Sequence, residues 1–557
     1  MKRLSGIISF LLLLTVCALK PDISTAQQSC ASLTTLKLAD TTITSATALA
    51  AGPFQPTSTT QAATGTSFDL PAFCRVSGSI KPTPDSDIRF EVWLPASGWN
   101  DKFLQLGNGG LAGSIGYANL TAQLQNNYAT AATDDGHQSS GIDGSWAIGH
   151  PEKVKDFGYR AVHGTSVVAK AIIRAFYGRA ARHSYFSGAS EGGREALIEA
   201  QQFPDDFDGI LAGCPGNNWI RLLATFIWNS QALLKDPASY IPQAKRQLIQ
   251  SATVAACDGQ DGVSDGLISD PQNCHFDPAS LKCKGADAVD CLTGAQVAAL
   301  KKIYAGPRSL RTGTRIGPGY EPGAEAEPGR PGISWASYVF GPTAGQSLDV
   351  AFGTGFFSGM VFEDPKWDFR TFDFDRDLQF AIAKLSPILD ATNPDLTRFK
   401  ARGGKLIQYH GWLDGSPPPG HSVEYYERVA AKSRGLKNTQ TFYRLFMVPG
   451  MMHCSGGPGP NNFGNTRASG PQGLDPDRNI FVALERWVER GTAPDKIIAT
   501  KYVDDDPKKG VTMTRPLCPY PQQARWTGKG STDDATNFVC RPPSKQAKAG
   551  ATRGQKR

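Results

Sequence analysis

The chain has 557 residues, too many for one ordinary domain, and a formal net charge of +7. That charge would suit a nucleic acid or a membrane surface as partner, but it lies at the ends: residues 1–26 carry +2, residues 541–557 carry +6, and the body carries −1. We therefore predict no nucleic-acid and no membrane partner, and a basic tail over 541–557 that is too polar to fold and is disordered.

The first 26 residues have the pattern of a secretory signal peptide. Two basic residues precede the apolar run Ile7–Val16, and the small residues Ser24–Ala26 precede the expected cleavage point. A lipid anchor at Cys17 is the less favoured alternative, because valine is large for the preceding position. No later apolar stretch approaches the roughly 20 residues that span a bilayer. We expect a secreted or periplasmic protein.

The body begins with an N-terminal extension over 27 to about 75, followed by a strand at Ile88–Leu94, where the residues alternate. A second strand, Phe103–Leu106, runs into the glycine-rich loop GNGG. Glycines let main-chain N–H groups approach a substrate oxygen closely, and Gly110 is the favoured donor. A glycine-rich turn that binds nothing is the alternative.

A nucleophile turn is predicted at YFSGASEGGR, residues 185–194, which places Ser190 in the pattern G-x-S-x-G. A strand at His183–Ser187 precedes it and a helix at Gly193–Phe203 follows it. Enzymes with a serine nucleophile hold it on such a strained strand-to-helix turn. The alternative is a turn that serves only to pack the strand against the helix.

Beyond a further strand at Gly209–Leu211, the pattern changes over about 220–395 to helical stretches and a Gly/Pro-rich surface loop. This segment is placed to cover the site, so we expect it to set specificity. Its aromatic residues are candidates for a substrate wall, although most should be core: Trp335, Tyr338, Phe340, Phe356, Phe357 and Trp367.

An aspartate- and glycine-rich loop, CDGQDGVSDGLISDP, occupies residues 257–271. Asp258, Asp261 and Asp265 put several hard oxygens on one tight loop, as calcium requires. It is not an EF-hand, because no glutamate stands at the twelfth position from Asp258. A surface turn without metal is the alternative, and any ion here would be structural.

Two more catalytic candidates follow predicted strands. Asp414 comes after Leu406–Tyr409, and His453 comes after Phe442–Val448. With Ser190 they appear in the order Ser, Asp, His, which is the order of the triad in α/β-hydrolases. The oxyanion hole is then expected to use the backbone N–H groups of Glu191 and Gly110. A last core helix is predicted at Ile480–Arg490.

Seven long segments resemble the tannase and feruloyl esterase family, which includes hydrolases of mono(2-hydroxyethyl) terephthalate. The segments are GNGG, AATDDGH, YFSGASEGGREAL, FPDDFDGILAG, KLIQYHGWLD, VPGMMHCSGGPG and RPLCPYPQ, and the similarity as a whole covers about residues 30–540. The resemblance implies an α/β-hydrolase core over 27–219 and 396–540, with a large inserted lid domain over 220–395. It implies a small aromatic ester as substrate, and it matches Ser190, Asp414 and His453 to the family triad.

The resemblance also implies a structural calcium ion held by Asp258, Asp261 and Asp265 with the carbonyls of Val263 and Leu267. An exported chain pairs most of its cysteines. The family pattern implies four disulfides: Cys30 with Cys74, Cys257 with Cys274, Cys283 with Cys291, and Cys518 with Cys540.

The fifth family disulfide joins a cysteine before the nucleophile to one after the histidine. Here the second cysteine is Cys454, but the first position is Ala189. Cys214 and Cys454 are left unassigned: they either form a replacement bridge or stay as two buried thiols. We favour the thiols, since a bridge requires Cα atoms no more than roughly 7 Å apart.

Three functions remain open on the sequence, which carries no signal of oligomeric state. The first is a serine esterase that cleaves phenolic acid esters such as feruloyl or galloyl esters. The second is a hydrolase of terephthalate or phthalate monoesters. The third, from another class, is a non-catalytic carbohydrate- or calcium-binding protein on a hydrolase scaffold.

Overall fold

A mixed sheet of nine strands forms the centre of the computed structural model, which describes residues 29–55, 67–327, 333–465 and 475–543. Across the sheet the strands are β1 (Thr41–Leu49), β4 (Phe73–Ile80), β5 (Ile88–Pro95), β7 (Ala129–Thr133), β6 (Lys102–Leu106), β8 (His183–Ala189), β9 (Gly209–Gly213), β10 (Lys405–Gly411) and β11 (Tyr443–Val448). From β1 to β7 the neighbours are antiparallel, and from β7 to β11 they are parallel.

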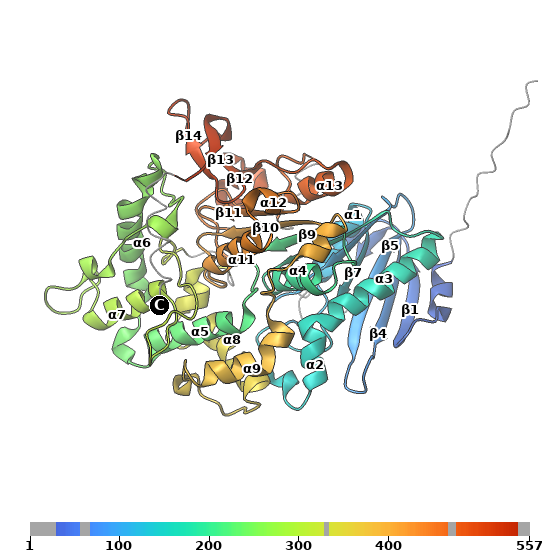
Figure 1. Ribbon diagram of the computed structural model, residues 1–557, viewed down its shortest axis with the longest axis horizontal. Coiled ribbons are helices and arrows are strands. Elements are labelled where there is room, and N and C mark those ends of the chain that lie inside the picture. The colour runs from blue at the N-terminus through green and yellow to red at the C-terminus, as the bar shows by residue number, and fades with distance from the viewer. Residues whose placement is uncertain (1–28, 56–66, 328–332, 466–474, 544–557) are drawn as a thin grey trace, which may run out of the picture.

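Helices cover both faces of this sheet (Figure 1). On one face, α3 (Ala161–Tyr177), α4 (Glu191–Gln202) and α11 (Gly420–Lys432) share a hydrophobic cluster with Phe103 of β6. On the other face, α1 (Tyr117–Gln125) and α13 (Ile480–Arg490) pack with the next residue, Leu104. Successive side chains of a strand point to opposite faces, so this alternation gives three layers. The predicted α/β class is confirmed.

Between β9 and β10 the chain leaves the sheet and forms helices instead. They are α5 (Trp219–Leu234), α6 (Gln243–Cys257), α7 (Gly294–Ala305), α8 (Leu348–Phe356), α9 (Asp377–Leu389) and α10 (Thr397–Ala401). We call residues 220–395 the insertion. It has its own hydrophobic cluster, which includes Phe226, Trp335 and Phe356. In Figure 1 it occupies the green and yellow side of the molecule, away from the blue strands.

The remaining elements are small. Short helices are α2 (Pro151–Lys155) and α12 (Leu436–Thr439), and three pairs of short strands are β2 (Gly52–Phe54) with β3 (Phe68–Leu70), β12 (Ile497–Tyr502) with β13 (Val511–Leu517), and β14 (Gln523–Trp526) with β15 (Phe538–Arg541). Among the described residues, no helix is long and apolar enough to cross a bilayer. The predicted signal peptide and nearly all of the predicted tail lie outside the described residues.

Strands and helices predicted around the catalytic candidates are observed, with ends that differ by at most two residues. The strand at His183–Ser187 is β8, which continues to Ala189, and the helix after it is α4, which begins two residues early at Glu191. The helix at Ile480–Arg490 is α13. The predicted N-terminal extension supplies β1, an edge strand of the central sheet.

Candidate active site

Ser190 occupies a strained turn between β8 and α4. Its backbone angles are φ 64° and ψ −117°, in a region that residues other than glycine rarely adopt. The turn is held by the Ser190 N–H, which donates to the carbonyl of Gly213 at 2.9 Å. A Cβ atom on Gly188 would lie 2.2 Å from the carbonyl oxygen of Gly192. The two glycines of G-x-S-x-G therefore approach each other too closely for a side chain to fit between them.

Asp414 and His453 lie on the loops that leave β10 and β11, on the same sheet edge as Ser190. The imidazole of His453 bridges the other two side chains. Its Nε2 lies 2.9 Å from Ser190 Oγ, and its Nδ1 lies 2.9 and 3.0 Å from the two oxygens of Asp414. The structure thus brings together three residues that are up to 263 positions apart in the sequence.

The carboxylate of Asp414 is fully buried yet well supplied with donors. Its Oδ1 accepts the Ser416 N–H at 2.7 Å, and its Oδ2 lies 3.2 Å from Nε2 of His410. Burial alone would raise the pKa of Asp414, but the neighbouring His453 and His410 outweigh it and hold that pKa below its ordinary value. Asp414 is therefore an anion that can orient and stabilise His453. Sequence reasoning missed His410, which lies four residues before Asp414 on the strand that leads to the Asp414 loop.

The two predicted oxyanion donors lie on adjoining segments. Glu191 is the first residue of α4, so its N–H has no partner within the helix. Gly110 has φ 63°, and a Cβ there would lie 2.4 Å from the carbonyl oxygen of Gly141. The loop that carries Gly110 is hydrogen-bonded to the nucleophile turn, since the Gly192 N–H donates to the carbonyl of Asn108 at 3.1 Å.

Two aromatic side chains of the insertion border this site. The ring of Tyr338 lies 5.4 Å from the ring of His453, and the ring of Phe352 lies 6.2 Å from that of Tyr338. Phe352 also reaches Gly110, because a Cβ on that glycine would lie 3.1 Å from the phenylalanine ring. Of the six predicted wall residues, Tyr338 alone is brought against the triad by a contact among the described residues.

The other predicted wall residues belong to the core of the insertion. Their side chains are fully buried or pack on neighbouring rings away from the triad: Trp335, Phe340, Phe356, Phe357 and Trp367. Sequence reasoning missed Phe352, whose helix α8 gives no signal that would separate it from Phe356 one turn later.

The insertion also supports the catalytic loops through polar contacts. The His453 N–H donates to the carbonyl of Ile333 at 3.0 Å, and the Tyr320 hydroxyl donates to the carbonyl of Ser416 at 2.7 Å. These two contacts anchor the loop of His453 and the loop that begins at Asp414. The insertion therefore helps to fix the geometry of the candidate triad.

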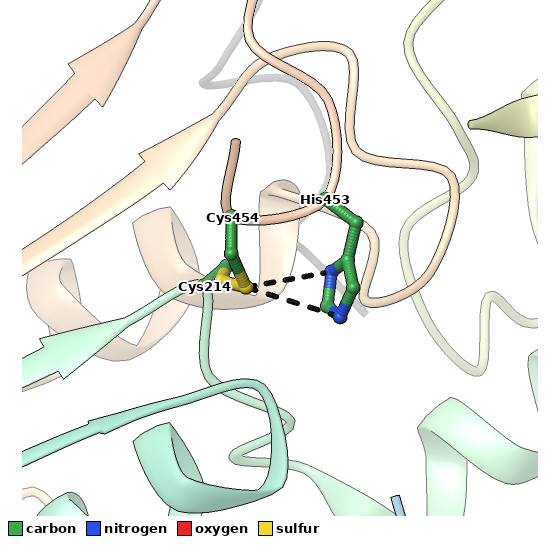
Figure 2. Close-up of side chains that lie close together, drawn as sticks. All are labelled: Cys214, His453 and Cys454. Carbon is green, nitrogen blue, oxygen red and sulfur yellow. Dashed lines mark hydrogen bonds between the residues drawn. A yellow bond between two sulfur atoms is a disulfide. The ribbon is translucent and has the colours of Figure 1, made fainter. Parts of the chain in front are cut away.

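Cys214 and Cys454 form a disulfide, so the expectation of two free thiols is wrong. Their Cα atoms are 5.5 Å apart, although the residues are 240 positions apart in the sequence. The sulfur of Cys454 lies 3.8 Å from both ring nitrogens of His453 (Figure 2). Cys214 meets it because the turn after β9 lies beside β10, where its N–H donates to Tyr409 O at 2.7 Å. The bridge replaces the one that Ala189 prevents.

The four disulfides that the resemblance implied are present: Cys30–Cys74, Cys257–Cys274, Cys283–Cys291 and Cys518–Cys540. With Cys214–Cys454 they account for ten of the eleven cysteines in the sequence. The eleventh, Cys17, lies in the predicted signal peptide.

The aspartate-rich loop is folded tightly by its own carboxylates. Asp258 accepts the N–H groups of Asp265 and Gly266 at 3.3 and 3.0 Å, and Asp261 accepts that of Val263 at 2.9 Å. One oxygen of Asp265 pairs with Arg515 at 2.5 Å. Burial raises the pKa of Asp265, Arg515 lowers it, and the two other aspartates raise it further. The hard-oxygen donors have the chemistry that calcium binds.

A separate cavity of about 1220 Å³ lies between the insertion and the C-terminal segment. Its lining includes Glu321, Trp412, Glu427 and Tyr520, but neither Ser190 nor His453. Its size does not make it the candidate active site, because the hydrogen-bonded side chains of Ser190, Asp414 and His453 lie elsewhere.

Comparison with known proteins gives a consistent result. Residues 74–541 match the model of the family described as tannase and feruloyl esterase. An uncharacterised esterase of Xanthomonas campestris pv. campestris is 44% identical, over 97% of this chain and 96% of its own. The mono(2-hydroxyethyl) terephthalate hydrolase of Piscinibacter sakaiensis is 34% identical over 86% of this chain and 87% of its own. The crystal structure of feruloyl esterase B from Aspergillus oryzae superposes with a TM-score of 0.83 at 29% identity, covering 91% of this chain and 98% of that one.

Proposed function

The chain belongs to the tannase and feruloyl esterase family, which are carboxylic ester hydrolases, and from this premise we propose that it is a secreted serine esterase for aromatic acid esters. The observation that carries the proposal is the unbroken hydrogen-bonded path from Asp414 through His453 to Ser190. It supplies an oriented base for a hydroxyl that is otherwise a weak nucleophile.

The proposed reaction is acyl transfer in two steps. Ser190 Oγ attacks the ester carbonyl while His453 Nε2 takes its proton, and the oxyanion accepts the N–H groups of Glu191 and Gly110. His453 then protonates the leaving alcohol. Water enters, loses its proton to His453, and releases the acid from the serine. Asp414 stays ionised throughout, because donors surround its carboxylate.

The acyl group is proposed to be aromatic, because Tyr338 and Phe352 border His453 and Gly110 on the insertion side. Ring edges and faces of this kind favour a planar aromatic partner. Feruloyl or galloyl esters are the first candidates. A terephthalate monoester is the second, and the kinship with the Piscinibacter enzyme supports it.

A matched panel tests the substrate: methyl ferulate, methyl gallate and mono(2-hydroxyethyl) terephthalate, with Ser190→Ala as control. A preference of at least tenfold in kcat/KM for one ester identifies the acyl group that the insertion selects. Labelling of Ser190 by a fluorophosphonate without cleavage of any ester would reject the substrate class. Absence of labelling would favour a non-catalytic binding protein.

The aspartate-rich loop is proposed to hold one structural calcium ion through Asp258, Asp261 and Asp265 with the carbonyls of Val263 and Leu267. The disulfide Cys257–Cys274 closes this segment and supports the proposal. When bound, the ion would stabilise the loop and take no part in the reaction. Elemental analysis of protein purified without chelator tests this: about one calcium per chain is expected, and none in Asp258→Asn.

A further inference from the structure

Three buried carboxyl groups meet next to the nucleophile turn, and the mechanism above leaves them without a role. Asp135 follows β7, while Glu191 and Glu195 lie one turn apart on α4. Each of these residues is at most 2% exposed, and one oxygen from each lies within 4.8 Å of the other two. Arg194, also fully buried, pairs with Glu191 at 2.5 Å. Three anions with one cation would be costly in such a place.

Protonation of two of the three carboxyl groups removes this electrostatic cost. Asp135 Oδ2 and Glu191 Oε2 are the two carboxyl oxygens of the group that have no donor among the described residues. Burial raises the pKa of both residues, and the adjacent Glu195 raises each pKa further. Protonated Asp135 and Glu191 can each donate to Glu195, which leaves Glu195 as the one carboxylate, and its charge balances that of Arg194. The orphaned oxygens then become the donors, and the group is neutral.

Glu195 is also the residue that ties this group to the glycine-rich loop. Its Oε2 accepts the backbone N–H of Asn108 at 3.0 Å, and its Oε1 accepts the Asn108 side-chain amide at 3.1 Å. The same amide donates to Asp135 Oδ1 at 2.8 Å. A Cβ on Gly107 would lie 2.7 Å from Glu195 Oε2, so the loop backbone lies directly against the carboxylate.

The two oxyanion donors stand on either side of this contact. Gly110 lies two residues after Asn108. Glu191, whose N–H is the other donor, is the first residue of the helix that carries Glu195. An oxyanion hole works only if both donors already point at the position of the oxyanion before the reaction. A displacement of about 1 Å at such a site costs on the order of 100-fold in rate.

We propose that Glu195 is a positioning residue of the oxyanion hole, a carboxylate that accepts hydrogen bonds from Asp135 and Glu191 and clamps the Asn108 loop to helix α4. The inference rests on the proposed esterase function. Within it, Glu195 touches no reacting atom and acts through the backbone of Asn108 and of α4.

Glu195→Gln tests the clamp, and Glu199→Gln is its matched control. Glu199 lies one turn after Glu195 on α4, is also fully buried, and accepts no hydrogen bond from Asn108. Glu195→Gln directs an NH₂ group toward the N–H donors of Asn108, whereas Glu199→Gln replaces a buried acid that accepts nothing from Asn108. We expect kcat for the preferred ester to fall about 10- to 100-fold in Glu195→Gln with KM within about threefold. In Glu199→Gln, kcat should stay within about threefold of wild type.

An oxyanion-specific readout separates positioning from general destabilisation. An aryl trifluoromethyl ketone forms an adduct with Ser190 that places an oxyanion in the hole. Its affinity should fall by the same factor as kcat in Glu195→Gln, while the melting temperatures of the two variants stay within a few degrees of each other. Equal kcat and ketone affinity in Glu195→Gln and Glu199→Gln would overturn the proposal.

Asn108→Ala keeps the proposal testable if Glu195→Gln does not fold. It should lower kcat by about fivefold or more at constant KM, and wild-type kcat in this variant would overturn the proposal. Where both fold, the double variant should lose less in kcat than the product of the two single losses, since both substitutions remove the contact between Glu195 and the Asn108 side-chain amide. Fluorophosphonate labelling of wild type keeps the two proposals apart: an unlabelled wild type defeats the esterase assignment, whereas a labelled, active wild type leaves the clamp to be judged by its variants.

Discussion

The catalytic edge of the central sheet and the insertion meet at one site but are built by different rules. At the sheet edge, Ser190, Asp414 and His453 each follow a strand within a few residues, so the pairing of strands fixes their positions. In the insertion, Tyr338 and Phe352 reach the site through the packing of helices and short turns. The proposed chemistry thus depends on strand register, and the proposed specificity depends on the packing of a long connection.

The two regions are nevertheless joined by direct bonds. The insertion accepts the His453 N–H at Ile333 and donates to the carbonyl of Ser416 through Tyr320. If the division of labour holds, changes at the sheet edge should lower the rate for every ester. Changes in the aromatic wall should alter the choice among esters.

The largest effect is expected from Asp414→Asn. The amide removes the negative charge that orients and stabilises the charged form of His453, so kcat should fall by about 10³- to 10⁴-fold for all esters. Steady-state kinetics on the substrate panel measures this, with circular dichroism to establish folding. A loss confined to one ester would contradict the separation of chemistry from specificity.

Removal of the Cys214–Cys454 bridge should have the next largest effect, and mainly on stability. Cys214→Ser with Cys454→Ser frees a loop of 240 residues that contains the whole insertion. A loss of about 2–5 kcal/mol of unfolding free energy is expected, measured by denaturant titration. Cys283→Ser with Cys291→Ser is the matched control, because that bridge spans only 8 residues within the insertion. An equal loss in the two double variants would contradict a special role for the catalytic bridge.

A variant with Cys214→Ala and Ala189→Cys asks whether the bridge can be moved. It offers Cys454 a partner directly before Ser190 and removes the present one. A thiol titration of the denatured protein should find no free thiol if the exchange succeeds. Recovery of the stability lost in the serine variant would show that the link between the catalytic loops matters more than its point of attachment.

The contrast between the two regions also explains what the sequence could reveal. Ser190, Asp414 and His453 were predictable because strand patterns and loop glycines are local, and α/β sheets place functional loops at the carboxyl ends of strands. The Cys214–Cys454 pairing was not, since it depends on the distance between two loops 240 residues apart. Phe352 was not, because Phe352 and Phe356 lie one turn apart on the same face of α8, and only the placement of the helix decides which of them borders the site. The cluster of carboxyl groups around Glu195 was not predicted, because Asn108, Asp135 and Glu195 meet only when three strands are adjacent.

A smaller effect, on specificity, is expected from Phe352→Ala. Loss of one aromatic contact of about 1 kcal/mol should lower kcat/KM for the preferred aromatic ester several-fold to tenfold, and leave 4-nitrophenyl acetate nearly unchanged. Phe380→Ala is the control, because Phe380 of α9 belongs to the same insertion but is 51% exposed. An equal loss for the acetate ester would mean that Phe352 supports Gly110 and does not select the acyl group.

The smallest effect concerns the pH dependence of stability, where the two regions again offer a matched pair. Burial raises the pKa of Asp134, beside the catalytic edge, to about 7, and burial with the nearby Asp270 raises the pKa of Glu321, in the insertion, to about 7. A carboxyl group whose pKa is higher in the folded than in the unfolded state favours folding below its unfolded pKa of about 4, and that contribution is lost as pH rises toward 7.

Asp134→Asn and Glu321→Gln should therefore each flatten the fall in melting temperature between pH 5 and pH 8, by about a few degrees, as scanning calorimetry would measure. The distribution of the effect matters more than its size. If the core and the insertion unfold as one unit, both variants shift the same transition and their effects add. Two transitions, each moved by only one of the variants, would show that the bonds from Ile333 and Tyr320 do not couple the insertion to the central sheet.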